Sequence, residues 1–213
     1  MPRTTDTHQR LLDAARDLFW ERGYAATGLA EILHRARANS GSFYFFFRSK
    51  EALLEAVLDW YLENIGLALV DPAYAKSRDP IERIFALLEG YRGKILATKY
   101  AFGCPIGRLA LEMDPGRRAV REKIAESFSA WTGAVRLCLE QAGDRLPRDL
   151  DRAALAQFVL TVMEGGVMQS RAHQDIAPFD ASVRQLRDYL RQLAAEAKHT
   201  VRRKNARHKR RSK

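Results

Sequence analysis

Apolar side chains recur every three or four residues along most of this 213-residue chain. That spacing places them on one face of an α-helix, whereas a half-buried strand would show strict alternation of apolar and polar residues. No segment shows the alternation, so the pattern predicts an all-α fold. The clearest stripes are Leu11, Leu12, Ala15, Leu18 and Phe19; Ile81, Ile84, Phe85, Leu88, Tyr91 and Ile95; Ile124, Phe128, Trp131, Val135 and Cys138; and Leu155, Phe158, Val159, Val162 and Met163.

The first stripe predicts a long helix that Gly23 ends, and two short helices and the start of a further helix follow it. Each of these is preceded by a residue whose side chain can cap free backbone N–H groups, namely Thr27, Asn39 and Ser49. The second short helix begins with small polar residues. Two compact helices about a turn, the second opening in this way, are typical of a helix-turn-helix that enters the major groove of DNA.

Helical geometry divides the aromatic run that follows Ser42. Phe43 and Phe47 are four residues apart and are expected in the core, whereas Tyr44 and Phe45 are expected to face outward. The use of Phe45 is not evident from the sequence.

This segment resembles the DNA-binding half of the tetracycline-repressor (TetR) family of bacterial regulators. The family pattern Gly-(Ser/Thr)-aromatic-Tyr-x-x-Phe-x-x-Lys-Glu is matched here by Gly41, Ser42, Phe43, Tyr44, Phe47, Lys50 and Glu51. The family usually has glycine at the turn, where this chain has Arg37. A non-glycine residue held at positive φ there costs about 1 kcal/mol, so the turn is expected either to be shifted along the chain or to be slightly strained.

The resemblance implies an N-terminal three-helix helix-turn-helix DNA-binding domain and a C-terminal helical ligand-binding and dimerisation domain. Base contacts are expected from Ser40, Ser42 and Asn39, and phosphate contacts from Thr27, Tyr44 and Lys50. Lys50 could instead be a solvated surface residue. The full set of expected DNA-binding residues is Thr27, Asn39, Ser40, Gly41, Ser42, Tyr44 and Lys50.

The composition of the chain and the positions of its helix-breaking residues predict three segments. Residues 1–52 form the DNA-binding domain, 53–197 the effector-binding and dimerisation domain, and 198–213 a basic tail. A helix from Lys50 toward Leu69 would leave the first domain and connect it mechanically to the second. Asp-Pro pairs and similar breaks separate the helices beyond it.

The net charge of +10 resides almost entirely in the tail. Residues 198–213 hold nine Lys or Arg and no acid, which leaves 27 basic and 26 acidic residues elsewhere. Such a run is most often a disordered, solvated end. The alternative is that it adds non-specific phosphate contacts, which would steepen the salt dependence of DNA binding.

Residues 151–197 are expected to pair with a second copy of the chain in a four-helix bundle. The apolar positions Val183, Leu186, Leu190, Leu193 and Ala197 form a helical seam, and Gly165 and Gly166 would let another backbone approach. The alternative is that the seam packs within the monomer. Members of the TetR family dimerise through such a four-helix bundle. A dimer would present two reading helices to a two-fold symmetric operator.

An enzyme is not expected, because no nucleophile with a base, paired carboxylates or phosphate-binding glycine loop is visible. No metal-ligand spacing or cofactor motif occurs either. The second domain is instead a candidate effector-binding domain, although its aromatic residues could equally be ordinary core. The expected pocket residues are Tyr91, Phe102, Cys104, Phe128, Trp131 and Phe158.

Cys104 is a candidate sensor. The segment from Phe102 to Glu112 looks like a stretch in a branch of the TetR family, some of whose members detect electrophiles or oxidants through a nearby cysteine. A thiolate at a helix start, one turn before Arg108, could have a lowered pKa. The alternative is a small buried packing residue, which is also the expectation for Cys138.

The sequence therefore predicts a cytoplasmic, homodimeric transcriptional repressor, released from a palindromic operator by a small-molecule effector or by cysteine modification. No signal peptide or apolar run of about 20 residues is present. Two alternatives remain. One is an activator of the same fold, and the other is an effector- or redox-binding helical protein that no longer reads DNA sequence.

Overall fold

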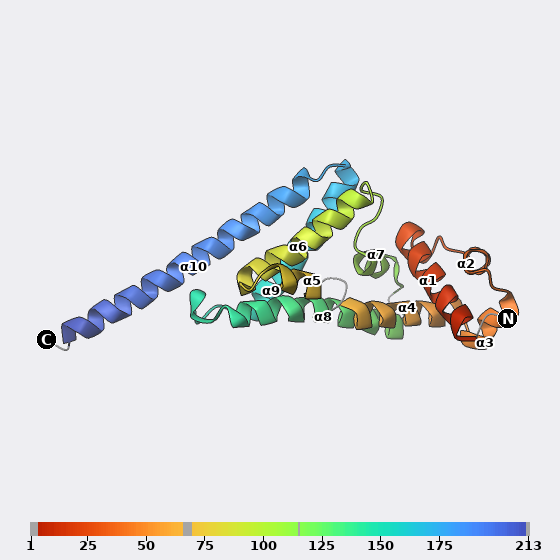
Figure 1. Cartoon of the computed structure of the whole chain (residues 1–213), viewed down its shortest axis with the longest axis horizontal. Coiled ribbons are helices and arrows are strands. Elements are labelled where there is room, and N and C mark those ends of the chain that lie inside the picture. Colours follow the sequence, from red (N-terminus) through yellow and green to blue (C-terminus); the bar gives the residue numbers. More distant parts are fainter. Residues whose placement is uncertain (1–3, 66–69, 115, 212–213) are drawn as a thin grey trace. The chain divides into compact units, whose positions relative to one another are not determined.

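The computed structural model describes residues 4–65, 70–114 and 116–211 (Figure 1). Every regular element within those ranges is helical, as the periodicity predicted. The elements are α1 (Thr4–Arg22), α2 (Leu29–Ala36), α3 (Ser40–Phe46), α4 (Lys50–Ile65), α5 (Asp71–Lys76), α6 (Pro80–Ala97), α7 (Pro105–Glu112), α8 (Arg118–Gln141), the short 3-10 helix η2 (Gly143–Arg145), α9 (Arg152–His173) and α10 (Ala177–Arg211). None of the described helices is both long and apolar enough to cross a membrane.

The chain forms two packing units. The N-terminal unit comprises Met1–Gly66 and Thr98–Ala130, and the C-terminal unit comprises Leu67–Ala97 and Trp131–Lys213. These units do not coincide with the predicted segments, because packing groups α4 and α7 with the helix-turn-helix. The predicted continuation of α4 toward Leu69 falls on residues 66–69, which lie outside the described ranges.

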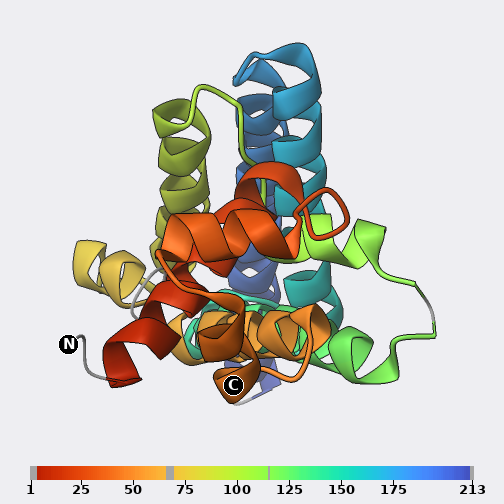
Figure 2. The same ribbon diagram turned by 90° about the vertical axis from the view of Figure 1, so that its right-hand side faces the viewer.

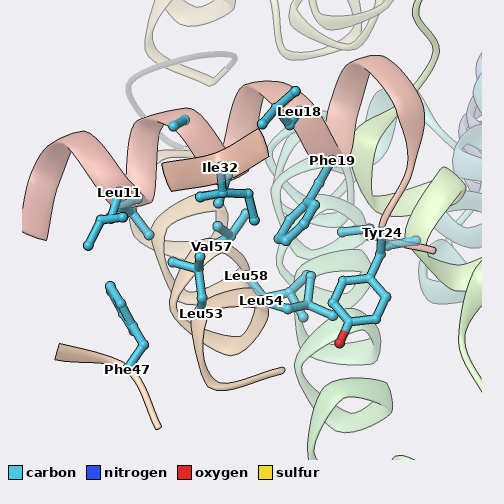
Figure 3. Packing of buried hydrophobic residues seen from close by; sticks show 14 of the residues in the cluster. Leu11, Leu18, Phe19, Tyr24, Ile32, Phe47, Leu53, Leu54, Val57 and Leu58 are labelled. Carbon is cyan, nitrogen blue, oxygen red and sulfur yellow. The ribbon is translucent and has the colours of Figure 1, made fainter. Parts of the chain in front are cut away.

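In the N-terminal unit, α1 is the central helix and packs against α2, α3, α4 and α7. Its apolar stripe meets Ile32 of α2, Phe43 of α3, and Leu53 and Leu54 of α4, all with side chains completely inaccessible to solvent. Figure 3 shows Phe19 of α1, Ile32 of α2 and Leu53 and Leu54 of α4 packed between the helices. Since α4 supplies four buried side chains to this core, including Val57 and Leu58, the described part of α4 belongs to the unit that carries the helix-turn-helix.

In the C-terminal unit, α9 and α10 form a helical pair joined by a short turn, and α6 packs against both (Figure 2). The two helices approach closely where Gly166 of α9 lies against Phe179 of α10. A Cβ at Gly166 would come within 2.9 Å of the Phe179 ring. The Ser170 hydroxyl oxygen also accepts a hydrogen bond from the Phe179 N–H at 3.2 Å.

The predicted seam on α10 packs within the chain itself. Leu186, Leu190, Leu193 and Ala197 are all at least nine-tenths buried in a single copy. Gly166 serves the contact with Phe179 described above, and nothing lies within 4 Å of a Cβ built on Gly165. For these four buried residues the alternative applies, that the seam packs within the monomer, because α9 and α6 cover that face of α10. Pairing of residues 151–197 with a second copy stays a prediction.

The prediction of a disordered tail is also corrected, since α10 continues to Arg211. After Pro178 the sequence contains no further proline or glycine, and most of the basic residues are good helix formers. Nothing in the local sequence therefore ends the helix. Residues 212 and 213 lie outside the described ranges.

Candidate nucleic-acid interface

The turn between α2 and α3 is held by an arginine in the left-handed conformation. Arg37 has φ 49° and ψ 48°, so of the two expectations the strained turn, with a non-glycine residue at positive φ, is the one observed. The conformation is supported because the Ala38 N–H donates to the Leu33 carbonyl oxygen at 3.0 Å. In addition, the Arg10 Nε of α1 donates to the Ala36 carbonyl oxygen at 2.9 Å. The last carbonyl groups of α2 are thus satisfied and the turn is fixed on α1.

The start of α3 is capped by Asn39, as predicted. The side-chain oxygen of Asn39 accepts a hydrogen bond from the Ser42 N–H at 2.7 Å. The carboxamide oxygen is therefore committed to the cap, and the NH₂ group is the part of Asn39 that can donate to a base. The predicted cap of α4 is likewise present, with Ser49 Oγ accepting from the Ala52 N–H at 3.1 Å.

The remaining residues of α3 divide between core and solvent as predicted. Phe43 and Phe47 are buried, while Tyr44 and Phe45 are 59% and 74% exposed. Ser40 and Gly41 are exposed and Ser42 is half-buried. One face of α3 therefore presents two small residues followed one turn later by two aromatic residues.

Thr27 does not have the predicted role. It is 1% exposed, and its hydroxyl donates at 2.7 Å to the Gly23 carbonyl oxygen beyond the end of α1. The residue before α2 is Gly28, which makes no side-chain cap. The threonine hydroxyl thus satisfies a buried carbonyl group, so the prediction that it caps α2 was wrong and its side chain is not available to a phosphate.

Lys50 is more deeply engaged than a surface lysine. Its ammonium group donates to the carbonyl oxygens of Tyr24 and Thr27, both at 2.7 Å, and lies 4.1 Å from the centroid of the Tyr24 ring. Burial, followed by the nearby positive charge of Arg117, lowers the pKa of Lys50 below its ordinary value. Two of its three N–H donors are used internally, which leaves one for a DNA phosphate.

The sequence reasoning missed how α7 is fixed to the end of α1. Arg108 Nη1 donates to the carbonyl oxygens of Trp20 and Glu21, at 3.3 and 3.2 Å. Arg108 Nε also pairs with Glu112 Oε1 at 3.0 Å, and Glu112 Oε2 accepts the Ala25 N–H at 3.1 Å. The i,i+4 spacing of this pair was the only signal visible in the sequence.

Glycine is required where this contact is closest. Gly23 has φ +91°, and a Cβ there would meet Glu112 Oε1 at 2.0 Å. A second connection lies nearby, since the Trp20 Nε1–H donates to the Gly103 carbonyl oxygen at 2.7 Å. The segment that contains Cys104 is therefore attached directly to α1.

Cys104 occupies the predicted helix start, where it is the N-cap of α7. Its Sγ accepts from the Gly107 N–H at 3.5 Å, and the residue is 7% exposed. It lies in the apolar core of the N-terminal unit, and the nearby Phe102 ring packs on Trp20 with centroids 4.9 Å apart.

The predicted effector-pocket residues fall into different units. Phe102, Cys104 and Phe128 belong to the N-terminal unit, whereas Tyr91, Trp131 and Phe158 belong to the C-terminal unit. Tyr91 and Trp131 do lie together, with ring centroids 6.3 Å apart and planes nearly perpendicular. Phe158 lies elsewhere, on the exposed side of α9.

Phe158 lines a groove of about 760 Å³ between α9 and α10. It is 48% exposed and faces the ring of Tyr189, itself 42% exposed, at a centroid distance of 6.3 Å. The lining is mostly apolar. It consists of Leu150, Asp151, Ala154, Leu155, Phe158, Val162, Ala181, Ser182, Gln185, Leu186 and Tyr189.

Two family models match the chain. Residues 11–57 match the model for bacterial regulatory proteins of the TetR family, and residues 80–185 match the C-terminal domain of LmrA/YxaF-like transcriptional regulators. The HTH-type transcriptional regulator LmrA of Bacillus subtilis is 31% identical over 175 residues, covering 81% of this chain and 90% of that protein. The chain belongs to the TetR family.

Other similarities agree with this membership. The HTH-type transcriptional repressor DhaR of a Mycobacterium species is 27% identical over 178 residues, which cover 83% of this chain and 88% of that protein. The crystal structure of a TetR regulatory protein from Rhodobacter sphaeroides superposes with a TM-score of 0.77 at 25% identity, covering 84% of this chain and 96% of that one. This TetR-family chain is therefore a DNA-binding transcriptional regulator with a helix-turn-helix, and not an enzyme.

Proposed function

We propose that this TetR-family protein is a homodimeric repressor that binds a two-fold symmetric operator and is released by a small-molecule effector or by modification of Cys104. The observation that carries the proposal is the exposed face of α3. It combines small residues that allow close approach to base edges with a capped start and a turn fixed on α1.

The proposed contacts follow from what each side chain has available. Ser40 and Ser42 carry hydroxyl groups, and Asn39 retains its NH₂ group, so these three are assigned to base edges. Gly41 is exposed and allows the backbone to approach. The exposed hydroxyl of Tyr44 and the remaining donor of Lys50 are assigned to phosphates.

The groove between α9 and α10 supports dimerisation through residues 151–197. Phe158 and Tyr189 leave apolar rings exposed beside it, and a second copy of the same two helices would cover them in a self-complementary interface. Pairing would also supply the second reading helix that a symmetric operator needs.

The attachment of α7 to α1 suggests how release occurs. Modification of Cys104 at the N-cap of α7 would favour a position of α7 in which Arg108 no longer caps the end of α1. Because α1 also fixes the α2–α3 turn through Arg10, the reading helix would change position with it.

The competing function is an effector- or redox-binding protein of the same fold without sequence-specific DNA reading. The large apolar ring of Phe45 on the reading face is the observation that favours this alternative, because family members commonly have a polar residue there. An activator would bind DNA through the same face, and transcription assays with the identified promoter distinguish it from a repressor.

The test is selection of bound sequences from a random duplex library, using the purified full chain at near-physiological salt. A two-fold symmetric motif is expected. Ser40→Ala should change the selected motif, whereas Tyr44→Phe should weaken binding to all sequences alike. If only unselective binding emerges, and it depends on the basic end of α10, the proposal is wrong and the competing function is favoured.

A further inference from the structure

Phe45 is the most exposed large apolar side chain on α3, with 74% of its surface accessible. It lies one helical turn after Gly41 and follows Tyr44, so it shares the outward face assigned to DNA. The other aromatic side chains of α3 either pack in the core or carry a polar group. If α3 reads DNA, the group that covers this phenyl ring must be apolar, because the ring offers no hydrogen-bond donor or acceptor.

One side of the ring already has a contact within the chain. It packs edge-on against Phe46 with centroids 4.9 Å apart, and Phe46 packs in turn against His8 of α1 at 5.4 Å. Phe46 also borders the apolar core of the N-terminal unit. Since the ring is supported from behind, little side-chain entropy is lost when its outer face is covered.

Among the base edges in the major groove, the 5-methyl of thymine is the one apolar group that projects into the groove. The other positions are hydrogen-bond donors or acceptors, which phenylalanine cannot satisfy, or the flat C5–H of cytosine, which offers much less apolar surface. We propose that Phe45 is a specificity-determining residue that packs against a thymine methyl in each operator half-site. This inference rests on the proposed function, because it requires that α3 reads an operator.

The competing partner for the ring is the deoxyribose of the DNA backbone, which is also partly apolar but is the same at every base pair. The two partners differ in one measurable respect. Packing on a methyl group makes affinity depend on the base, whereas packing on a sugar does not.

The test replaces thymine by uracil, which removes the methyl group and leaves every hydrogen-bonding atom of the base. Each thymine of the selected operator is replaced in turn, symmetrically in both half-sites, and the dissociation constant of the full chain is measured by fluorescence anisotropy at constant salt. We expect one position at which uracil weakens binding by roughly fourfold per half-site, the value of one buried methyl group. With Phe45→Ala, thymine and uracil should bind equally at that position.

Two controls make the result specific. Tyr44→Phe should weaken binding but keep the preference for thymine over uracil. Leu111→Ala removes another highly exposed apolar side chain of the same unit, 83% accessible on α7, and should leave the preference and the affinity unchanged.

Failure of this inference can be told apart from failure of the proposed function. If an operator is selected but no thymine shows a methyl effect, or if Phe45→Ala keeps the effect, Phe45 does not read a methyl group while the regulator proposal stands. If no operator is selected at all, both are overturned.

Discussion

The ammonium nitrogen of Lys50 lies 2.7 Å from the carbonyl oxygen of Thr27, at the connection between α1 and α2. A second bond of the same length joins it to the Tyr24 carbonyl oxygen. The first residue of α4 thus holds the connection that leads into the helix-turn-helix. A residue that the sequence assigned to phosphate contacts is therefore also part of the framework that positions α3.

Lys50→Met should lower the free energy of unfolding by roughly 2 kcal/mol, since hydrogen bonds to a charged donor are lost and two carbonyl groups are left without it. Urea unfolding followed by circular dichroism measures this. Arg48→Met, two residues earlier and exposed, is the matched control and should change stability by less than about 0.5 kcal/mol. Equal effects of the two substitutions would contradict a structural role for Lys50.

Phe158→Glu should dissociate the proposed dimer, because it places a charge in the apolar groove between α9 and α10. Sedimentation equilibrium should show a dimer dissociation constant raised by at least roughly tenfold. Leu137→Glu is the control, since Leu137 on α8 is 45% exposed, close to the 48% of Phe158, but does not line the groove. A dimer that survives Phe158→Glu would place the interface elsewhere.

The two cysteines should differ in their effect on DNA binding. Burial raises the pKa of the Cys138 thiol, and its side chain is inaccessible, so little reactive thiolate forms. Cys104 is also buried, at 7% exposure, but its Sγ accepts a hydrogen bond from the Gly107 N–H at the start of α7, which favours the thiolate. N-ethylmaleimide should therefore weaken operator binding by the wild-type chain and by Cys138→Ser, but not by Cys104→Ser. Equal sensitivity of both variants would exclude Cys104 as the sensor.

Lowering the pH should remove the contribution of Asp79 to the stability of the C-terminal unit. Asp79 accepts two hydrogen bonds from Arg145, at 3.0 and 2.9 Å, and one from the Ile81 N–H at the start of α6. The bonds from Arg145 lower the pKa of Asp79. Because the folded-state pKa lies below the unfolded one, this stabilisation is present above the unfolded pKa of about 3.9 and is lost as the pH falls through the folded value.

Asp79→Asn keeps an oxygen for the cap but loses the charge. The variant should be less stable near neutral pH by up to about 1 kcal/mol, and the difference from wild type should shrink as the pH falls below the unfolded pKa. Unfolding curves across that pH range measure it. Asp144→Asn is the comparison. Asp144 forms an ion pair with Arg148, but its side chain is 70% exposed, so removing its charge should lower the free energy of unfolding by less. A pH-independent difference would show that the charge does not contribute.

The basic end of α10 should affect salt dependence and not sequence preference. A chain ending at His199 keeps the buried seam and loses eight of the nine Lys or Arg in residues 198–213. If these residues bind phosphates, the slope of log affinity against log salt should fall in magnitude by about 0.9 for each phosphate no longer neutralised, with the same selected motif. Replacing the eight residues by Gln in the full-length chain separates charge from length. An unchanged slope would leave the extension without a role in DNA binding.

Much of the reading element was predictable from the sequence, because local rules decide it. Capping by Asn39 and Ser49, the left-handed turn at Arg37 and the inward positions of Phe43 and Phe47 depend on neighbours within a few residues. Helical periodicity and capping chemistry act over that range, and both are visible in the order of residues.

Most of the errors and omissions involve partners far apart in the chain. Thr27 is the exception, because its hydroxyl donates to the carbonyl oxygen of Gly23, four residues earlier, in place of capping α2. The seam around Leu190 was assigned to a second copy of the chain, because an apolar stripe in a sequence does not indicate which helix will pack on it. The Arg108 caps on α1, with partners 87 and 88 residues away, carry no local signal.

The sequence by itself determined that the chain is helical, where its reading helix begins, and which side of that helix faces outward. Only the tertiary structure decided which polar groups are already satisfied and which apolar stripes are already covered. The physical reason is that backbone propensity and periodicity act between near neighbours, whereas burial and long-range hydrogen bonds exist only once the helices have packed.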